Sequence, residues 1–299
     1  MSNKVESLEI PAKANKKKVL SPIVCVILFL KIVIIGYFIY LFNQSFEAGS
    51  VLFDRTFFLF IIAGFFAQLI DGALGMAYGI SCTTLLLSLG IPPKLASASV
   101  HTSEIFTTGV SGLSHIRFNN LDKKLFFSIV FTGVIGATAG AYLLADILDG
   151  SMVKPYISAY LVILGAYLIY KAFRKKENKK PKRKYASFLA LFGGLFDAVG
   201  GGGWGPIVTS NLLSQGHNPR KTIGTVNTAE FFVTYFATVV FIFILGVQHL
   251  DIVLGLVIGG VIAAPLGAYI ASKVNPKALL ILVGALVVLT SSYNLFQLL

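Results

Sequence analysis

Two stretches of the sequence match each other without a gap: DGALGMAYGISCTTLLLSLGIPPKLASASVHTSE (residues 71–104) and DAVGGGGWGPIVTSNLLSQGHNPRKTIGTVNTAE (residues 197–230). Of the 34 aligned positions, 12 are identical, where chance at average composition gives about 2 or 3. Each stretch opens with an aspartate and a glycine cluster and closes with a glutamate. A match of this length within one chain predicts that the chain consists of two homologous halves.

The composition places these halves in a membrane. The chain has 299 residues, of which 56% are hydrophobic and 13% charged, whereas soluble domains are about a quarter charged. Hydrophobic segments of about 20 residues recur, the length that a helix needs to cross a bilayer. Unbroken apolar runs such as residues 278–283 disagree with the alternation of a β-barrel. We therefore expect an all-α membrane protein in contact with lipid. The two cysteines, Cys25 and Cys82, show no metal-binding spacing, and no disulfide, metal or cofactor is expected.

Hydrophobic and charged segments predict five parts along the chain. In order they are a cytoplasmic basic tail (1–18), an additional transmembrane helix (19–42), the first repeat (57–173), a cytoplasmic basic linker (174–185) and the second, inverted repeat (186–298).

Each repeat is expected to open with a re-entrant helical hairpin. Segments 57–70 and 76–89 flank a glycine-rich break at 71–75, and segments 186–197 and 204–215 flank a second break at 198–203. Segments of 12 to 14 residues are too short to span the bilayer. Three longer helices follow in each half: 95–114, 124–147 and 152–173, then 219–246, 251–272 and 276–298. Three crossings, or five if the short segments cross, is an odd number, so the halves have opposite orientations and the architecture is an inverted repeat.

Basic residues predict the orientation. Of the 25 Lys and Arg residues, 21 fall in the tail, the linker and the loops on their side, and three fall in the alternate loops. By the positive-inside rule the N-terminus is cytoplasmic and the C-terminus is outside. The net charge of +12 is thus a topology signal, and no nucleic-acid partner is expected. Lys31 lies within a span, and we expect it to face neighbouring helices or to extend toward the membrane surface.

Four carboxylates fall inside the predicted membrane region, and they form two repeat-related pairs: Asp71 with Asp197, and Glu104 with Glu230. Carboxylates in a membrane interior are candidates for function. The aspartates precede the breaks, where they could cap a half-helix or take part in coupling. The glutamates lie inside a helix with no end to cap, so gating or proton coupling is favoured, with an interhelical hydrogen bond as the alternative.

The helix that carries Glu104 is predicted to have a polar face. Ser97, His101, Glu104 and Thr108 follow one another at intervals of four, three and four residues, which places them on one side of a helix. His101 can carry a proton, but its repeat counterpart Asn227 cannot.

The glycine breaks predict an anion site. Gly200, Gly201, Gly202 and Gly203 precede Trp204, Gly205 and Pro206, and such a run is unfavourable inside a helix. Proline suits the first turn of a following half-helix, whose N–H groups and partial positive charge attract anions. The alternative is tight helix packing through small residues. The expected substrate-binding residues are Gly75, Tyr78, Gly79 and Thr102 of the first half, and Gly200, Gly201, Gly202, Gly203, Trp204, Gly205, Asn227 and Thr228 of the second.

These motifs resemble the TauE/SafE sulfite-exporter family over about residues 57–298. The resemblance rests on DAVGGGGWGP (197–206) and on the paired segments SVHTSE (99–104) and TVNTAE (225–230). It implies a secondary transporter of the bacterial cytoplasmic membrane that moves sulfite, small organosulfonates or related sulfur oxyanions. In the first half, Met76, Ala77 and Ile80 replace glycines and the proline, so the second half is expected to contribute more to the site.

The predicted function is therefore secondary transport of a small sulfur-containing anion, such as sulfite, sulfoacetate or thiosulfate, bound at the midplane between the two hairpins. Protons are one option for the coupling ion, and the oligomeric state is left open. Two alternatives are an intramembrane enzyme that uses Asp71 and Asp197 as a carboxylate pair and a transporter of another small anion.

Overall fold

The computed structural model describes residues 21–47, 54–174, 185–215, 217–247, 249–271 and 275–298. Every regular element in these ranges is a helix. The predicted basic tail (1–18) and residues 175–184 of the predicted linker lie outside the described ranges.

The first half of the chain folds into a leading helix and five further helices. They are α1 (Pro22–Glu47), α2 (Arg55–Leu74), α3 (Tyr78–Ser88), α4 (Pro93–Arg117), α5 (Lys123–Tyr142), which continues as the π-helical turn η1 (Leu143–Ile147), and α6 (Gly150–Phe173).

The second half contains the corresponding helices in the same order. They are α7 (Ala186–Gly200), the π-helical turn η2 (Gly205–Thr209), α8 (Ser210–Ser214), α9 (Pro219–Leu245), α10 (Leu250–Ala271) and α11 (Pro276–Phe296). The longer helices agree with the expected segments to within a few residues at each end.

The first opening helix differs from the expectation. Segment 57–70 was expected to be too short to span, but α2 has 20 residues. The carboxylate of Asp54 extends its start by accepting hydrogen bonds from the N–H groups of Thr56 at 2.9 Å and Phe57 at 3.0 Å. At the other end, residues 71–74 stay helical and the chain leaves the helix at Gly75, which adopts φ +66°. The first break therefore covers residues 75–77 rather than 71–75.

The second break is displaced in the same way. Helix α7 continues to Gly200 and ends at Gly201, whose φ of +68° is a left-handed conformation that glycine adopts without strain. The break covers residues 201–203 rather than 198–203. In both halves the aspartate lies in the last turn of the first helix, one turn before the break.

Six helices in the described ranges are long and apolar enough to cross a membrane, as expected for a multi-pass membrane protein. Their segments are 22–44, 55–72, 123–147, 152–173, 220–245 and 277–296. Helix α4 falls outside this group because its buried face is polar, with serines, threonines, His101 and Glu104.

The helices pack in pairs that link the two halves. Helix α2 packs against α10, α7 against α5, α4 against α9 and α6 against α11. Glycines allow the close approach: a Cβ on Gly64 of α2 would lie 2.8 Å from the Cα of Leu256 in α10, and one on Gly165 of α6 would lie 2.9 Å from the carbonyl oxygen of Gly284 in α11. The most extensive helix–helix contacts therefore join the two halves.

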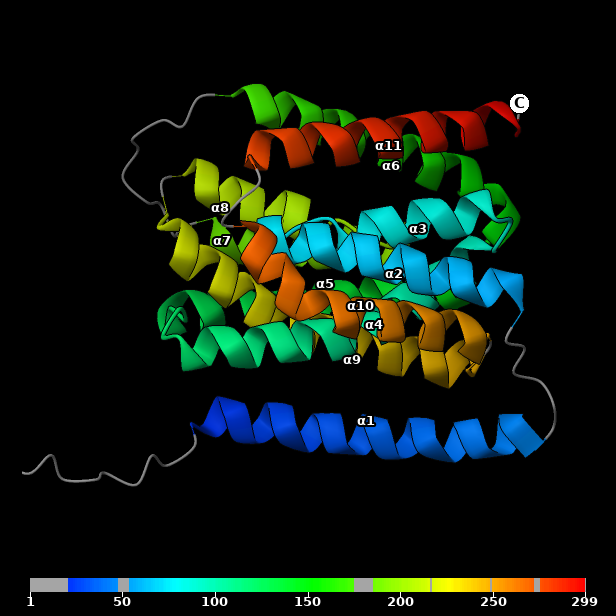
Figure 1. Cartoon of the computed structure of the whole chain (residues 1–299), viewed down its shortest axis with the longest axis horizontal. Helices are drawn as coiled ribbons and strands as arrows, with labels where there is room; N and C mark the ends of the chain where they lie inside the picture. Colours follow the sequence, from blue (N-terminus) through cyan, green and yellow to red (C-terminus); the bar gives the residue numbers. More distant parts are fainter. Residues whose placement is uncertain are drawn as a thin grey trace, which may run out of the picture.

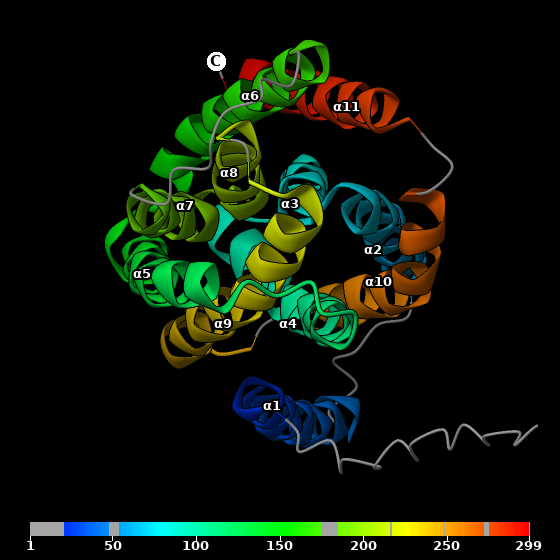
Figure 2. The same cartoon turned by 90° about the vertical axis from the view of Figure 1, so that its left-hand side faces the viewer.

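Helix α1 lies beside the rest of the bundle and contacts α4, whereas α6 and α11 lie on the opposite side (Figures 1 and 2). Ile27, Ile34 and Phe38 of α1 belong to a hydrophobic cluster with Ile105 and Phe231. Lys31 faces the neighbouring helix: its side-chain carbons and Nζ lie over Gly109 of α4. The short helices α3 and α8 lie toward opposite ends of the bundle (Figure 1).

Candidate functional site

Helix α4 carries the polar side chains of the candidate site into the middle of the bundle. It is a 25-residue helix that starts at Pro93 and contacts α3, α7, α9 and α10. Ser97, His101 and Glu104 are all buried on it. Their spacing of four and three residues puts them on one face, as predicted, and this face meets the last turn of α7.

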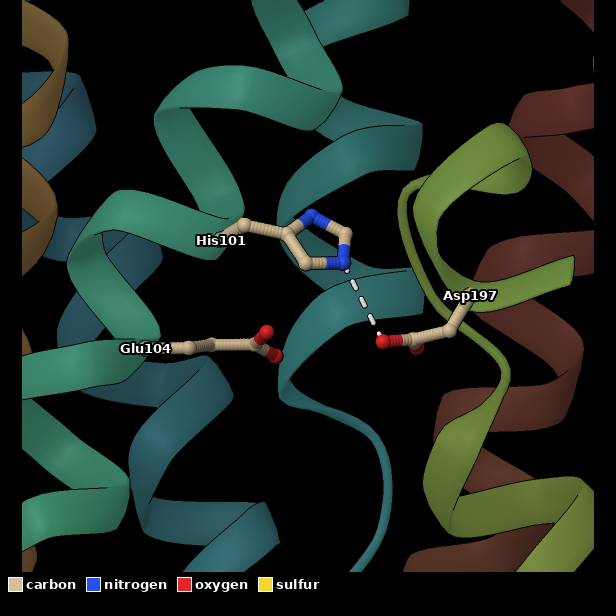
Figure 3. Close-up of side chains that lie close together, drawn as sticks. All are labelled: His101, Glu104 and Asp197. Carbon is tan, nitrogen blue, oxygen red and sulfur yellow. Dashed lines mark hydrogen bonds and ion pairs between the residues drawn. The ribbon is translucent and has the colours of Figure 1, made fainter. Parts of the chain in front are cut away.

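His101, Glu104 and Asp197 converge at this contact (Figure 3). The Nε2 atom of His101 lies 3.1 Å from Oδ2 of Asp197. One nitrogen or oxygen from each of the three side chains lies within 4.8 Å of the others, and all three residues are buried. Such a group can hold a proton, and its donor atoms could also ligate a metal ion; the predicted absence of a metal stays a prediction.

Asp197 holds the second break together. Its backbone carbonyl accepts hydrogen bonds from the N–H groups of Gly201 and Gly202. Its carboxylate oxygen Oδ1 accepts from the N–H of Trp204 at 2.9 Å, at the start of the next half-helix. This is the capping contact weighed from the sequence, and it leaves Oδ2 free to meet His101.

Asp71 makes a weaker version of the same contacts in the first half. Its carbonyl accepts from the N–H of Gly75 at 2.6 Å, and its Oδ1 lies 3.5 Å from the N–H nitrogen of Tyr78. The two aspartates thus cap separate half-helices.

The two breaks pack directly against each other. A Cβ on Gly79 would lie 2.9 Å from the Cα of Gly202, and one on Gly205 would lie 2.6 Å from the Cβ of Met76. The hydroxyl of Thr83 donates to the carbonyl oxygen of Gly201 in the opposite hairpin. Glycine is needed at these positions because the backbones touch, so the predicted packing role and the predicted anion role fall on the same residues.

The sequence analysis missed two residues at this junction, Thr83 and Tyr160. Thr83 and its repeat counterpart Thr209 are identical, and that identity was a usable signal. Tyr160 of α6 had no such signal: its hydroxyl donates to the carbonyl oxygen of Gly202 at 3.2 Å, and its ring lies against Gly200, where a Cβ would come within 2.7 Å of Cδ1. A Cβ on Gly203 would also meet Tyr160.

The repeat-related aromatic residues Tyr78 and Trp204 are buried and bond to flanking helices. The hydroxyl of Tyr78 lies 3.1 Å from Oγ of Ser103 and 3.4 Å from the carbonyl oxygen of Leu256. Trp204 donates from its indole nitrogen to the carbonyl oxygen of Val226 at 3.4 Å. They fix the two half-helices to α4, α10 and α9.

Several predicted site residues are not joined to the group by their described hydrogen bonds. The hydroxyls of Thr102 and Thr228 donate to carbonyls of Ala98 and Gly224, one turn earlier in their own helices. Asn227 donates to Oγ of Ser111 at 3.1 Å. The hydroxyls of Thr102 and Thr228 are therefore used within their own helices in this arrangement.

Glu230 is half-buried on α9. It interacts electrostatically with Asp71, Glu104 and Asp197. The four carboxylates predicted from the repeat therefore belong to one electrostatic group, although they lie on four different helices.

Comparisons with known proteins agree with this arrangement. The sequence pattern of the family described as "Sulfite exporter TauE/SafE" matches residues 60–294. A protein named "Probable membrane transporter protein YtnM" from Bacillus subtilis (strain 168) is 43% identical over 252 residues, which cover 81% of this chain and 84% of the relative. No solved structure matches the chain.

Both descriptions are of transport proteins, so the alternative of an intramembrane enzyme with Asp71 and Asp197 as its carboxylate pair is wrong. The matched residues, 60–294, include all the predicted site residues. The chain belongs to the TauE/SafE family of membrane transporters.

Proposed function

We propose that this transporter is a secondary transporter of a small sulfur-containing anion, such as sulfite, an organosulfonate like sulfoacetate, or thiosulfate. The anion binds at the membrane midplane, where the two glycine breaks meet beside His101, Glu104 and Asp197. The observation that carries the proposal is this convergence of two half-helix N-termini from different halves of the chain. The description of the family as sulfite exporters supports the choice of a sulfur oxyanion.

We propose further that the two halves are inverted repeats with re-entrant hairpins α2–α3 and α7–η2–α8. The pairing of helices supports this arrangement, because exchanging the halves converts the α2–α10 contact into the α7–α5 contact and leaves the α4–α9 and α6–α11 contacts unchanged. Helix α2 is long enough to cross the membrane by itself, but α3 has 11 residues, about 16 Å at 1.5 Å per residue, which is about half the hydrocarbon thickness. The proposal of a re-entrant hairpin in the first half therefore rests on α3. The N-terminus is then cytoplasmic and the C-terminus outside, in the bacterial cytoplasmic membrane.

In the described arrangement Asp197 occupies the N–H groups to which an anion would bind. The Gly201, Gly202 and Trp204 amides all donate to this residue. Turning the Asp197 carboxylate away would free only the Trp204 N–H, because the Gly201 and Gly202 N–H groups donate to the backbone carbonyl of Asp197. The substrate therefore reaches those two N–H groups only when the break itself rearranges. Glu104 and Glu230, which lie close to this position but are not joined to it by described hydrogen bonds, have gating or coupling roles.

Counterflow in proteoliposomes tests the proposal. Vesicles containing the purified full-length protein are loaded with unlabelled sulfite, thiosulfate, sulfoacetate or sulfate, and uptake of the labelled anion is followed. At least one of the first three anions should accelerate uptake above that of protein-free vesicles. If none of them exchanges while a small carboxylate does, the substrate class is wrong and another small anion is transported.

A further inference from the structure

A chain of hydrogen bonds determines where His101 carries its hydrogen. The Oγ of Ser97 donates to the carbonyl oxygen of Ala198 at 2.6 Å. The Nδ1 of His101 lies 2.9 Å from the carbonyl oxygen of Ser97 and 3.3 Å from its Oγ. A carbonyl oxygen only accepts, and the hydroxyl hydrogen of Ser97 is already used. Nδ1 must therefore carry a hydrogen and donate it to Ser97.

The contact between His101 and Asp197 then requires one more proton. The Nε2 atom of His101 and the Oδ2 atom of Asp197 are 3.1 Å apart. Without a hydrogen between them both atoms would be acceptors facing each other in a buried site. With one, either the imidazole is doubly protonated beside an aspartate ion or a neutral imidazole accepts from the carboxylic acid. Both forms contain one shared proton and have no net charge.

Three carboxylates surround this pair. Glu104 on α4 interacts electrostatically with His101, Asp197 and Asp71 of α2. Glu230 of α9 interacts with Glu104, Asp71 and Asp197. The neighbouring neutral groups are Tyr78 and Cys82 of α3, which interact with Glu104 and Asp71, and Tyr160 of α6, which interacts with Asp197. Loss of the shared proton would therefore add a negative charge where carboxylates already gather.

The other half of the chain cannot reproduce this pair. The position equivalent to His101 is Asn227, whose side-chain nitrogen donates to Ser111 and which cannot bind a proton. Asp71, the equivalent of Asp197, has its Oδ1 at 3.5 Å from the nitrogen of Tyr78. Among the residues that the structure describes, the pair therefore occurs once rather than in both halves.

We propose that His101 and Asp197 together bind a single proton that is transported in the same direction as the substrate anion. This inference rests on the proposed function and assigns its coupling to one pair. With the proton bound the pair is neutral and tolerates an anion at the adjacent break. When the proton leaves to water on the side to which the site is open, a histidine protonated at Nδ1 only and an aspartate ion remain, and they repel the anion.

Calorimetry of anion binding tests the proposal on the purified full-length protein. Thiosulfate, whose charge is constant between about pH 6 and about pH 9, is titrated in buffers with different heats of ionisation, which gives the number of protons taken up per anion. We expect uptake to rise from none at low pH to one at high pH, and thiosulfate to bind more tightly at low pH. In H101N and in D197N the proton uptake should disappear.

Two further variants test which side chain binds the proton. H115N replaces a histidine in the last turn of the same helix, next to Asn120, and should keep the uptake of one proton. E104Q tests the rival assignment of the coupling proton to Glu104. Uptake of one proton that persists in H101N, or that disappears in E104Q alone, would overturn the proposal.

A second measurement separates this inference from the proposed function. The chain has four histidines, so the nitrogen-15 signals of His101 are identified by comparing the wild type with H101N. We expect Nδ1 to stay protonated over the whole pH range, while the signal of Nε2 changes as the proton shared with Asp197 is lost. If thiosulfate, sulfite and sulfoacetate all fail to bind, the proposed function fails. The nitrogen-15 spectrum still tests whether His101 and Asp197 share a proton. A His101 with a bare Nδ1 refutes the shared proton.

Discussion

Substitution of Gly202 by alanine tests whether the two breaks meet as closely as the structure describes. A Cβ at this position would lie 2.6 Å from the carbonyl carbon of Gly79 and 2.8 Å from Cγ2 of Ile80. Carbon atoms normally pack at about 3.5 to 4.0 Å, so one hairpin tip must move by about 1 Å. Backbone atoms on the opposite side prevent a simple side-chain rotation from relieving the overlap.

The expected cost follows from this overlap. Adding a methyl group to a filled core typically costs about 1 to 3 kcal/mol. For a chain of this size that corresponds to a fall in the melting temperature of roughly 2 to 10 °C. The displaced tip also moves the start of the half-helix that Asp197 caps, so anion exchange should slow.

Thermal unfolding in detergent and counterflow in vesicles measure the two effects. Gly36→Ala in α1 is the matched control, because nothing lies within 4 Å of the added Cβ and alanine favours a helix by up to about 1 kcal/mol over glycine. It should unfold at or slightly above the wild-type temperature. A Gly202→Ala protein with wild-type stability and exchange would refute the close packing of the breaks and its importance for transport.

Three further predictions concern strain, packing and topology. Ala77 adopts φ 142°, a conformation that costs a non-glycine residue about 1 to 3 kcal/mol; Ala77→Gly should therefore raise the melting temperature, and a fall would show that the strain is absent. Trp204 is completely buried, and its ring lies against Gly133; Trp204→Ala should cost about 3 to 5 kcal/mol, and a loss below about 1 kcal/mol in a thermal melt would contradict the packing. For topology, single cysteines are introduced into a chain that otherwise lacks cysteine, and sealed cells are treated with an impermeant thiol reagent. Cysteines at three positions should react from outside, and a cysteine at a fourth should stay protected. Labelling of the fourth would contradict the predicted orientation. The reactive positions are Ser45, Gly150 and His249, and the protected position is Asn178.

Much of the fold could be predicted from the sequence because membrane helices obey local rules. Length and hydrophobicity determine a transmembrane helix almost alone, since the bilayer fixes the required span. The long helices were therefore placed to within a few residues, and the resemblance to the TauE/SafE family was correct. The repeat identified the four carboxylates, and helical spacing placed His101 and Glu104 on one face.

The ends of α2 and α7 were less well predicted, because a single aspartate or glycine can extend or stop a helix by one turn. Asp54 extends α2 at its start, and Gly75 rather than Asp71 ends it. A glycine-rich sequence indicates that a break exists, but the residue at which the chain turns depends on which carbonyl and amide groups find partners.

The sequence by itself determined the class of protein, the repeat and the residue types of the site, since each of these follows from composition, periodicity or internal similarity. Only the tertiary structure decided which of those residues meet. His101 and Asp197 are 96 positions apart and touch because α4 packs against the last turn of α7, whereas Thr102, directly after His101, bonds to its own helix. Side-chain direction changes by about 100° with each residue of a helix, so partnership across a bundle depends on packing that no local pattern contains.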